Sequence, residues 1–423
     1  MSFAGSYFER YPSGPALFSK APHPDLSLIV IIPAHREHGI ERVVEQLISE
    51  QAFHGRLELL ILFNASEKDQ EQIHKENADA YAALQAYLNS REIPYDWDVH
   101  VALNNQLPHR HAGVGLARKL LMDEALRRFD QLEKPDGVIV SYDADTLCEP
   151  GFIQAIQEAY YRWPGLRAAN HHFEHPIQGT EFPREVYEGI IRYELYLRYY
   201  HEALKRTGFP YPHFTIGSAF SFRAHAYMAV GGMNKRKAGE DFYFIHKLLL
   251  GGEFGYIREA MVYPSPRPSD RVPFGTGKAI QQFIDSGEEK VYSPESFEKL
   301  RLLIKQIEEL YPLSQEDIST WLTHLPIDLR DFLESVSFLK EIEKIRSNVS
   351  SPSSFRKRFF HWFNGLMVLR FLNFDKNQYS PGMSIEEAAR ALAGNLGWDI
   401  PELGEAKELL LFYREVQRKA PLL

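Results

Sequence analysis

Two aspartates one residue apart, Asp143 and Asp145, follow the apolar run of residues 137–141. That run predicts a buried strand, and carboxylates at the end of such a strand are costly to place without a cation that neutralises them. A hard divalent metal, Mn²⁺ or Mg²⁺, binds carboxylate oxygens, and a diphosphate can complete its coordination. The pair therefore predicts a site for a metal and a diphosphate. Two solvated turn residues are the alternative, since Asp favours turns.

A second acidic pair, Glu240 and Asp241, begins a predicted helix of residues 241–250. The structural alternative is an N-terminal cap, where Asp stabilises a helix by about 1 kcal/mol. As a catalytic group, Asp241 would accept the proton of an acceptor hydroxyl, and Glu240 would orient the acceptor or its loop. One pair for a metal-bound diphosphate and another for a base favour transfer of a group from a nucleotide-diphosphate donor.

Positive charge for the phosphates is expected near the start of another predicted helix. Arg118 follows Gly113 and Gly115 there, and a glycine-rich entry to a helix N-terminus suits phosphate. The run is not a dinucleotide-binding loop, because it lacks a third glycine and follows a polar stretch rather than a strand. We expect the neighbouring Lys119 to lie on a solvated helix face.

Two further arginines, Arg267 and Arg271, lie in a segment of residues 263–277 that is rich in Pro, Gly and Ser and predicts a long loop. Arginine binds phosphate through two parallel hydrogen bonds, and long irregular loops often cover active sites. Both arginines are therefore candidate diphosphate contacts. A surface linker between domains is the open alternative.

Several histidines invite a metal interpretation, but their spacings match no zinc motif, and an exposed polar loop is favoured for them. One of them could still contact the acceptor or a phosphate. They are His109, His111, His171, His172 and His175.

These candidate residues need a scaffold, and alternating apolar and amphipathic runs predict one. The expected strands are residues 26–32, 57–63, 97–103, 137–142, 166–170 and 216–222. The expected helices are residues 40–48, 67–89, 116–129, 184–206 and 241–250, with another that starts at Pro150-Gly151. This order predicts an α/β fold with a mostly parallel sheet flanked by helices. Ligands of such sheets bind beyond the carboxyl ends of the strands.

The composition turns helical from about Lys278, and no further strand is expected after it. We therefore predict a sheet-based domain of residues 1–277 and a helical C-terminal domain of residues 278–423. The C-terminal region could shape the acceptor site or mediate self-association into a homo-oligomer.

Composition limits the class of protein. Among 423 residues, 57 acidic residues outnumber 48 basic ones, which gives a formal net charge of -9. A general nucleic-acid-binding protein usually shows the opposite balance, so no nucleic-acid partner is expected. Cys148 is the only cysteine, which excludes an intramolecular disulfide and a thiolate-rich metal site. No signal peptide and no apolar run long enough for a bilayer is visible, so we expect a soluble cytoplasmic protein.

Residues 356–371 combine basic residues with aromatic and aliphatic ones. Such a segment could lie on a membrane as an amphipathic helix. An ordinary core helix with a basic start is favoured, because Asn364, Gly365 and Arg370 interrupt a continuous lipid-facing surface. Peripheral membrane contact stays the open alternative.

In their order along the chain, four segments resemble those of family 2 glycosyltransferases with the GT-A fold. They cover roughly residues 26–263 and are Ile31-Ile32-Pro33-Ala34-His35-Arg36-Glu37, the Ala117-Arg118 helix start, the DxD motif Asp143-Ala144-Asp145, and Gly231-Gly232 leading to Gly239-Glu240-Asp241. The resemblance implies a Rossmann-like GT-A domain, a nucleotide-sugar donor and a divalent metal cofactor, Mn²⁺ or Mg²⁺.

The same resemblance implies roles for individual residues. The nucleotide pocket would be lined by Pro33, Ala34 and Glu37. Asp143 would lie near the ribose and the metal, and Asp145 would bind the metal directly. Asp241 would be the base of an inverting, single-displacement transfer without a covalent intermediate.

The sequence departs from the family at two places. Where the family often carries an acidic pair that contacts the base, this chain has Phe63-Asn64; Asn64 can hydrogen-bond a base, but a preference for uracil does not follow. The usual Asn after Ala-Arg is replaced by Lys119. The Gln-rich, Trp-containing motif of processive synthases is not visible, so the resemblance implies a soluble, non-processive, hexosyltransferase-like enzyme with an unknown acceptor.

Two other functions stay open. A sugar nucleotidyltransferase also needs acidic residues and a metal, but it usually has a glycine-rich loop with a basic residue straight after the first strand, and residues 33–39 contain one glycine. A non-catalytic nucleotide- or glycan-binding module would not need its acidic pairs.

Overall fold

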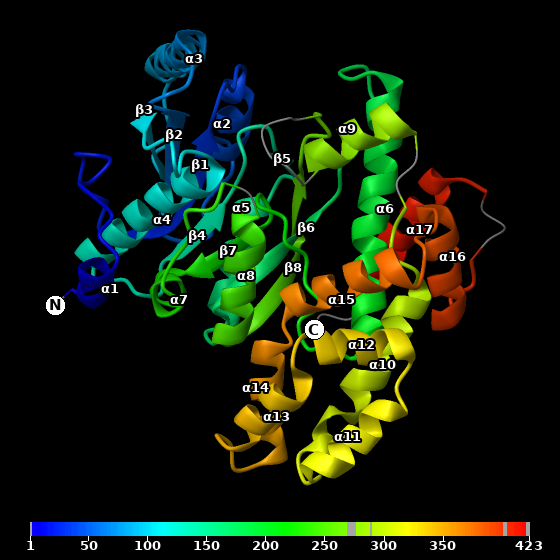
Figure 1. Cartoon of the computed structure of the whole chain (residues 1–423). Helices are drawn as coiled ribbons and strands as arrows, with labels where there is room; N and C mark the ends of the chain where they lie inside the picture. Colours follow the sequence, from blue (N-terminus) through cyan, green and yellow to red (C-terminus); the bar gives the residue numbers. More distant parts are fainter. Residues whose placement is uncertain (1, 238, 269–275, 288–289, 401–403, 420–423) are drawn as a thin grey trace. The chain divides into compact units, whose positions relative to one another are not determined.

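The computed structural model describes residues 2–237, 239–268, 276–287, 290–400 and 404–419, which form two compact units (Figure 1). Within this part, the first unit comprises residues 2–187 and 215–279, and the second comprises residues 188–214 and 280–419. Helices α6 (Arg184–Thr207) and α9 (Thr276–Ser286) each begin in the first unit and end in the second. Whether the predicted division at residue 277 separates independently folding domains stays a prediction.

The first unit is built on one eight-stranded sheet with the order β3-β2-β1-β4-β7-β6-β8-β5. The strands are β1 Leu26–Ala34, β2 Arg56–Ser66, β3 Trp97–Leu107, β4 Val138–Ser141, β5 Leu147–Cys148, β6 Ala168–Phe173, β7 Phe220–Arg223 and β8 Phe254–Tyr263. Only β7 and β5 run against the other strands. The predicted α/β fold with a mostly parallel sheet is therefore confirmed, although β5 and β8 were not expected.

Helices cover both faces of this sheet. Those of the first unit are α1 Gly5–Arg10, α2 Ile40–Ile48, α3 Glu71–Asn89, α4 Val114–Gln131, α5 Phe152–Arg162, α7 Ala224–Ala229 and α8 Glu240–Gly251. The apolar residues of α2 recur on one face, which is buried. Strands β1 and β2 are apolar and buried along nearly their whole length, as expected of parallel strands covered on both sides.

The strand order of the sheet reverses at β1. The chain passes from β1 to β2 and β3 on one side, and then returns through α4 to β4 on the other side of β1. Right-handed crossovers therefore place α2 and α3 on one face and α4 on the opposite face. The carboxyl ends of β1 and β4 consequently flank a topological switch point, which is where open α/β sheets bind their ligands.

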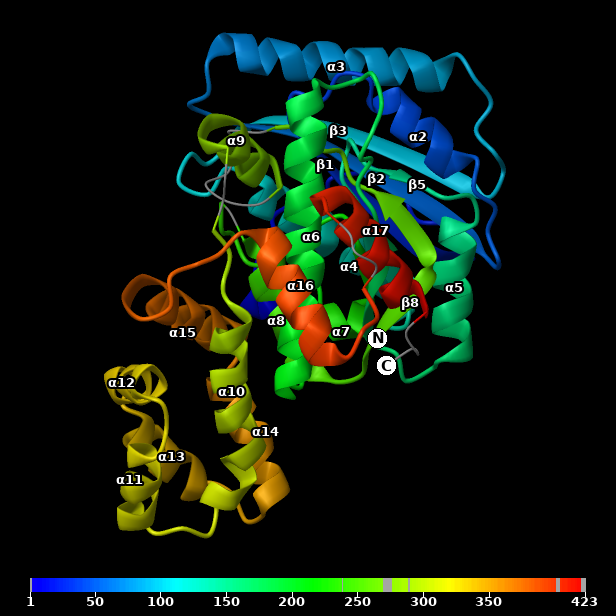
Figure 2. The same cartoon turned by 90° about the vertical axis from the view of Figure 1, so that its right-hand side faces the viewer.

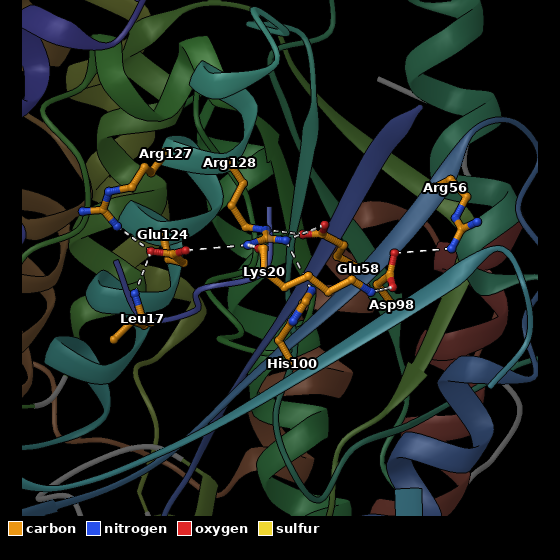
Figure 3. Close-up of polar contacts among 9 residues, drawn as sticks. All are labelled: Leu17, Lys20, Arg56, Glu58, Asp98, His100, Glu124, Arg127 and Arg128. Atoms are coloured by element: carbon orange, nitrogen blue, oxygen red, sulfur yellow. Dashed lines mark hydrogen bonds and ion pairs between the residues drawn. The ribbon is translucent and has the colours of Figure 1, made fainter. Parts of the chain in front are cut away.

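At the amino ends of β2 and β3, a charged network fixes the segment that precedes β1 (Figure 3). Arg128 of α4 donates to both carboxylate oxygens of Glu58 and to the carbonyl oxygen of Lys20 at 3.0 Å. Burial raises the pKa of Glu58, and Arg128 opposes this. Burial and the charge of Arg128 lower the pKa of His100 to about 4, so His100 is neutral here. This network lies at the amino ends of the strands (Figure 3), whereas the switch point lies at their carboxyl ends.

The second unit is helical. Besides the parts of α6 and α9, its helices are α10 Pro294–Gln306, η1 Ile307–Leu310, α11 Gln315–Thr323, α12 Ile327–Ser335, α13 Phe338–Arg346, α14 Pro352–Trp362, α15 Gly365–Gln378, α16 Ile385–Leu396 and α17 Ala406–Lys419. Helices α16 and α17 lie beside α6 (Figure 2), where the fully buried Glu194 pairs with Arg198 and Arg414. Among the described residues after β8 no named strand occurs, as predicted.

The segment with the open membrane alternative forms α14 and α15. Phe355, Phe359, Phe360 and Phe363 are buried in the second unit, which agrees with the favoured core-helix interpretation. Within the described part of the chain, no helix combines the length and apolar character that crossing a bilayer requires.

Candidate functional site

The turn after β1 directs Glu37 inward. Arg36 adopts a left-handed conformation with φ 57°, which is uncommon for a residue with a side chain and marks a position that its surroundings hold in place. Its backbone N–H donates to Oδ1 of the fully buried Asn77 at 2.7 Å, and its guanidinium pairs with Glu76. As a result Glu37 is buried although it is charged.

Glu37 and Asp145 share one arginine. Nη2 of Arg267 lies 2.9 and 3.1 Å from the two carboxylate oxygens of Glu37 and 2.9 Å from Oδ2 of Asp145. Burial opposes the charge of Arg267, but the two carboxylates outweigh burial and raise its pKa above the ordinary value. Arg267 therefore joins the ends of β1 and β4 to the segment after β8. Arg271, the second predicted diphosphate contact, lies outside the described residues.

Asp143 and Glu240 share a second arginine. Arg118, near the start of α4, is buried and pairs with Asp143 through Nη2 and with Glu240 through Nη1. Gly217 makes room for its guanidinium, because a Cβ atom at residue 217 would lie 2.5 Å from Nη2 of Arg118. The acidic pair after β4 and the acidic pair at the start of α8 are thus brought to one place.

Asp241 is partly buried beside this arrangement. Its Oδ1 accepts a hydrogen bond from the backbone N–H of Phe242 at 2.7 Å. Removal from water and the charge of Glu240 raise the pKa of Asp241 to about 7, and Arg118 opposes the rise. A carboxylate with a pKa near neutrality is suited to accept a proton during a reaction.

The residues predicted to line a nucleotide pocket lie at the same edge. Pro33 and Ala34 end β1, are buried, and lie in register with Leu62 and Phe63 of the parallel strand β2. Asn64 is also buried, and its Nδ2 donates to the carbonyl oxygen of Ala34 at 2.8 Å. The amide of Asn64 therefore holds two strand ends together, and its contact with a base stays a prediction.

The position of Lys119 differs from the one expected from the sequence. It does not lie on a solvated helix face but is buried, and its Nζ lies 2.8 Å from Oδ2 of Asp123 and 3.2 Å from the hydroxyl of Tyr7. Tyr7 and Tyr227 both donate to Oδ1 of Asp123. The helix is enclosed on more sides than its sequence indicates, so its charged residues pair with one another or with neighbouring elements.

The positions of several histidines also differ from those expected. His109 is exposed, as expected, but His171, His172 and His175 are buried in and after β6. Nε2 of His171 contacts the hydroxyl of Ser221 on β7 at 2.8 Å, and burial lowers the pKa of His171 to about 3. These residues belong to the core rather than to an exposed polar loop.

The donor set fits a divalent metal of a particular kind. Asp143 and Asp145 offer hard carboxylate oxygens, and about a third of each side chain is exposed, 33% and 35%. Within the described residues, no three His, Cys, Asp or Glu side chains gather into a metal site. Mg²⁺ is commonly bound by one or two carboxylates together with substrate phosphates rather than by an all-protein cage, and this pair suits that mode.

Arg118 and Arg267 each bridge two carboxylates, which was not expected from the sequence, and neither was the role of Gly217. One signal pointed to buried pairing: the helix now called α4 carries seven charged residues, at positions 118, 119, 123, 124, 127, 128 and 130, among apolar residues on several faces. Oppositely charged residues three or four positions apart can pair across a helix turn, as Lys119 with Asp123 and Glu124 with Arg127 do. The partners of Arg118 and Arg267 are distant in the sequence, so no local sequence pattern indicates them.

Comparison with known proteins adds little. Searches against protein families and against curated sequences give no match. Among solved structures, one described as a mycobacterial protein has a TM-score of 0.37 and 17% identity over 61% of this chain and 72% of its own. S. aureus TarS residues 1–349 in complex with UDP has a TM-score of 0.36 and 11% identity over 86% of this chain and 92% of its own. Both scores are low, so the functional conclusion depends on the residues of this chain.

Proposed function

We propose that this chain is an inverting, metal-dependent glycosyltransferase of the GT-A type, similar to family 2. The observation that carries the proposal is the gathering of carboxylates at the switch point of the sheet: Arg267 joins Glu37 to Asp145, and Arg118 joins Asp143 to Glu240. With Asp241, five carboxylates face two guanidinium groups. Such an excess of negative charge favours a site that takes up a cation together with its ligand.

In this proposal, different residues of the site bind the donor and act on the acceptor. Asp143 and Asp145 would hold the divalent metal, which when bound neutralises the negative charge of a departing diphosphate. Arg267 would supply further positive charge to the diphosphate. Pro33, Ala34 and Glu37 would position the nucleoside at the end of β1.

Asp241 would act on the acceptor. As the acceptor oxygen forms its bond to the anomeric carbon, its O–H bond breaks and the proton passes to the Asp241 carboxylate. The bond between the anomeric carbon and the donor phosphate oxygen breaks in the same step, and the nucleoside diphosphate leaves with that electron pair. Glu240, held by Arg118, would fix the start of α8 so that Asp241 keeps its position.

The proposal is tested by a thermal-shift screen of UDP, GDP, dTDP, ADP and CDP with Mn²⁺ or Mg²⁺. Ligands that bind the folded state raise its melting temperature, and we expect at least one nucleotide to do so only when metal is present. Asp145→Asn should abolish this shift. Asp79→Asn, which changes an exposed carboxylate on α3, is the matched control and should leave the shift unchanged. A protein that responds to no nucleotide, with or without metal, would contradict the proposal.

A further inference from the structure

Basic side chains are exposed on two loops, one of which shortly precedes Asp241 in the chain. Lys235, Arg236 and Lys237 are exposed in the segment just before α8, and Arg110 is exposed in the loop between β3 and α4. Four positive charges at this place contrast with the formal net charge of -9 for the whole chain. The proposed transfer does not account for them.

The two loops are in contact. A Cβ atom at Gly115 would collide with the carbonyl oxygen of Arg236, and one at Gly113 would lie 3.5 Å from Cα of Lys237. The absence of a side chain at Gly115 therefore permits the two backbones to approach closely. The 108–113 loop and residues 234–237 therefore lie side by side, and we call their basic side chains the basic rim.

The rim is fixed to the first turn of α8. Nδ2 of Asn234 donates to the carbonyl oxygen of Glu240 at 3.1 Å, and Oδ1 of Asn234 accepts from the backbone N–H of Arg236 at 3.0 Å. The guanidinium of Arg236 lies 3.8 Å from the ring centre of Tyr243. These contacts connect the basic rim to the first turn of α8, which also carries Asp241.

In the portion of the chain that the structure describes, Arg110, Lys235, Arg236 and Lys237 form no ion pair. Arg118 and Arg267, by contrast, are each engaged by two carboxylates. Clustered like charges repel one another, so an anion that lies among them gains attraction from all of them.

We propose that the acceptor is a phosphorylated alcohol whose phosphate binds to Arg110, Lys235, Arg236 and Lys237 while its hydroxyl lies at Asp241. This inference rests on the proposed function, because Asp241 must be the base. Arginine forks and lysine ammonium groups are the usual protein partners of phosphate. The donor diphosphate belongs with the metal carboxylates and Arg267, so the two substrates would be bound by different groups of cations.

The test uses the full chain, saturated with the nucleoside diphosphate and metal identified by the thermal-shift screen. Binding of glycerol 3-phosphate and of ribose 5-phosphate is measured by calorimetry, with glycerol and ribose as uncharged controls. We expect at least one of the phosphates to bind and both uncharged alcohols to fail. The triple variant R110Q/K235Q/K237Q should weaken phosphate binding by at least about tenfold and leave nucleotide binding within about twofold.

A matched control removes three exposed charges elsewhere, in K75Q/R162Q/K344Q, and should bind both ligands as the unaltered chain does. Failure of the nucleotide to bind the unaltered chain would overturn the proposed function itself. Nucleotide binding without any phosphate binding would overturn the acceptor inference alone. Equal loss of nucleotide and phosphate binding in the triple variant would assign the rim to the donor and likewise overturn the inference.

Discussion

The pKa of the Asp241 carboxyl is strongly affected by its place in the fold. Partial burial and the neighbouring Glu240 raise its pKa to about 7, against 3.8 for a free side chain. Because the folded-state value is the higher one, folding favours the protonated carboxyl. The stability that this provides is complete below about pH 4 and is lost as the pH rises through 7.

This linkage predicts a pH-dependent effect of Asp241→Asn. Asparagine cannot ionise, so the variant avoids the cost of a charged carboxylate that the unaltered protein bears at high pH. We expect the two proteins to be similar in free energy of unfolding at pH 4.5, and the variant to be more stable by roughly 1–3 kcal/mol at pH 8. Urea denaturation at both values measures this. A variant that is less stable at pH 8 would show that Asp241 is not disfavoured as an anion.

At the residue scale, sequence reasoning found the two acidic pairs because carboxylates at the end of an apolar strand or after glycines stand out locally. It could not find their partners. Asp143 and Arg118 are 25 positions apart, and Glu37 and Arg267 are 230 apart. The burial of Lys119 could not be predicted for a related reason, since its partner Tyr7 lies 112 positions away in the chain.

At the scale of elements, the site depends on how closely α4 approaches the segment before β7. Gly217 lies against the guanidinium of Arg118, and its carbonyl oxygen accepts from the hydroxyl of Ser141 at 2.8 Å, at the end of β4. The glycine thus lets one strand end and one helix start share Arg118.

Gly217→Ala should therefore disturb the geometry of the site without creating a cavity in the core. The new methyl group would displace Arg118 and with it Asp143 and Glu240, and a displacement of about 1 Å can lower activity on the order of 100-fold. Donor hydrolysis in the presence of metal measures the effect. Gly394→Ala adds a methyl group to α16 where no atom lies within 4 Å, and it should leave activity unchanged. Equal activity of both variants would mean that the position of Arg118 is unimportant.

Sequence periodicity located most elements of the parallel half of the sheet, because buried parallel strands are long apolar runs and their helices are amphipathic. It failed for β5, which has two residues, and did not foresee β8. It also could not show that β7 runs antiparallel between β4 and β6. Such pairings are decided by tertiary packing and not by the local pattern.

At the scale of the whole molecule, every described residue of the proposed site belongs to the first unit. The second unit has its own buried charges, since the carboxylate of Glu194 accepts from Arg198 at 2.8 Å and from Arg414 at 2.7 Å. Units with separate cores often unfold separately.

Calorimetry should then show two unfolding transitions, of which the nucleotide and metal shift only one. Glu194→Gln leaves two buried arginines without their charged partner, at a cost of about 3–5 kcal/mol. We expect it to lower the other transition by roughly 6–20 °C and to leave the ligand-sensitive one in place. A single transition that both the ligand and this substitution move would show that the two units unfold as one.

The central claim is that Asp145 serves the metal-bound diphosphate and Asp241 serves the acceptor. The most direct measurement is isothermal titration of the nucleotide, with and without Mn²⁺, into Asp145→Asn and Asp241→Asn, with donor hydrolysis followed in parallel. We predict that Asp145→Asn loses metal-dependent binding by about tenfold or more, while Asp241→Asn binds the nucleotide normally but hydrolyses no donor. Nucleotide binding that falls equally in both variants, or hydrolysis that survives in Asp241→Asn, would contradict this division of roles.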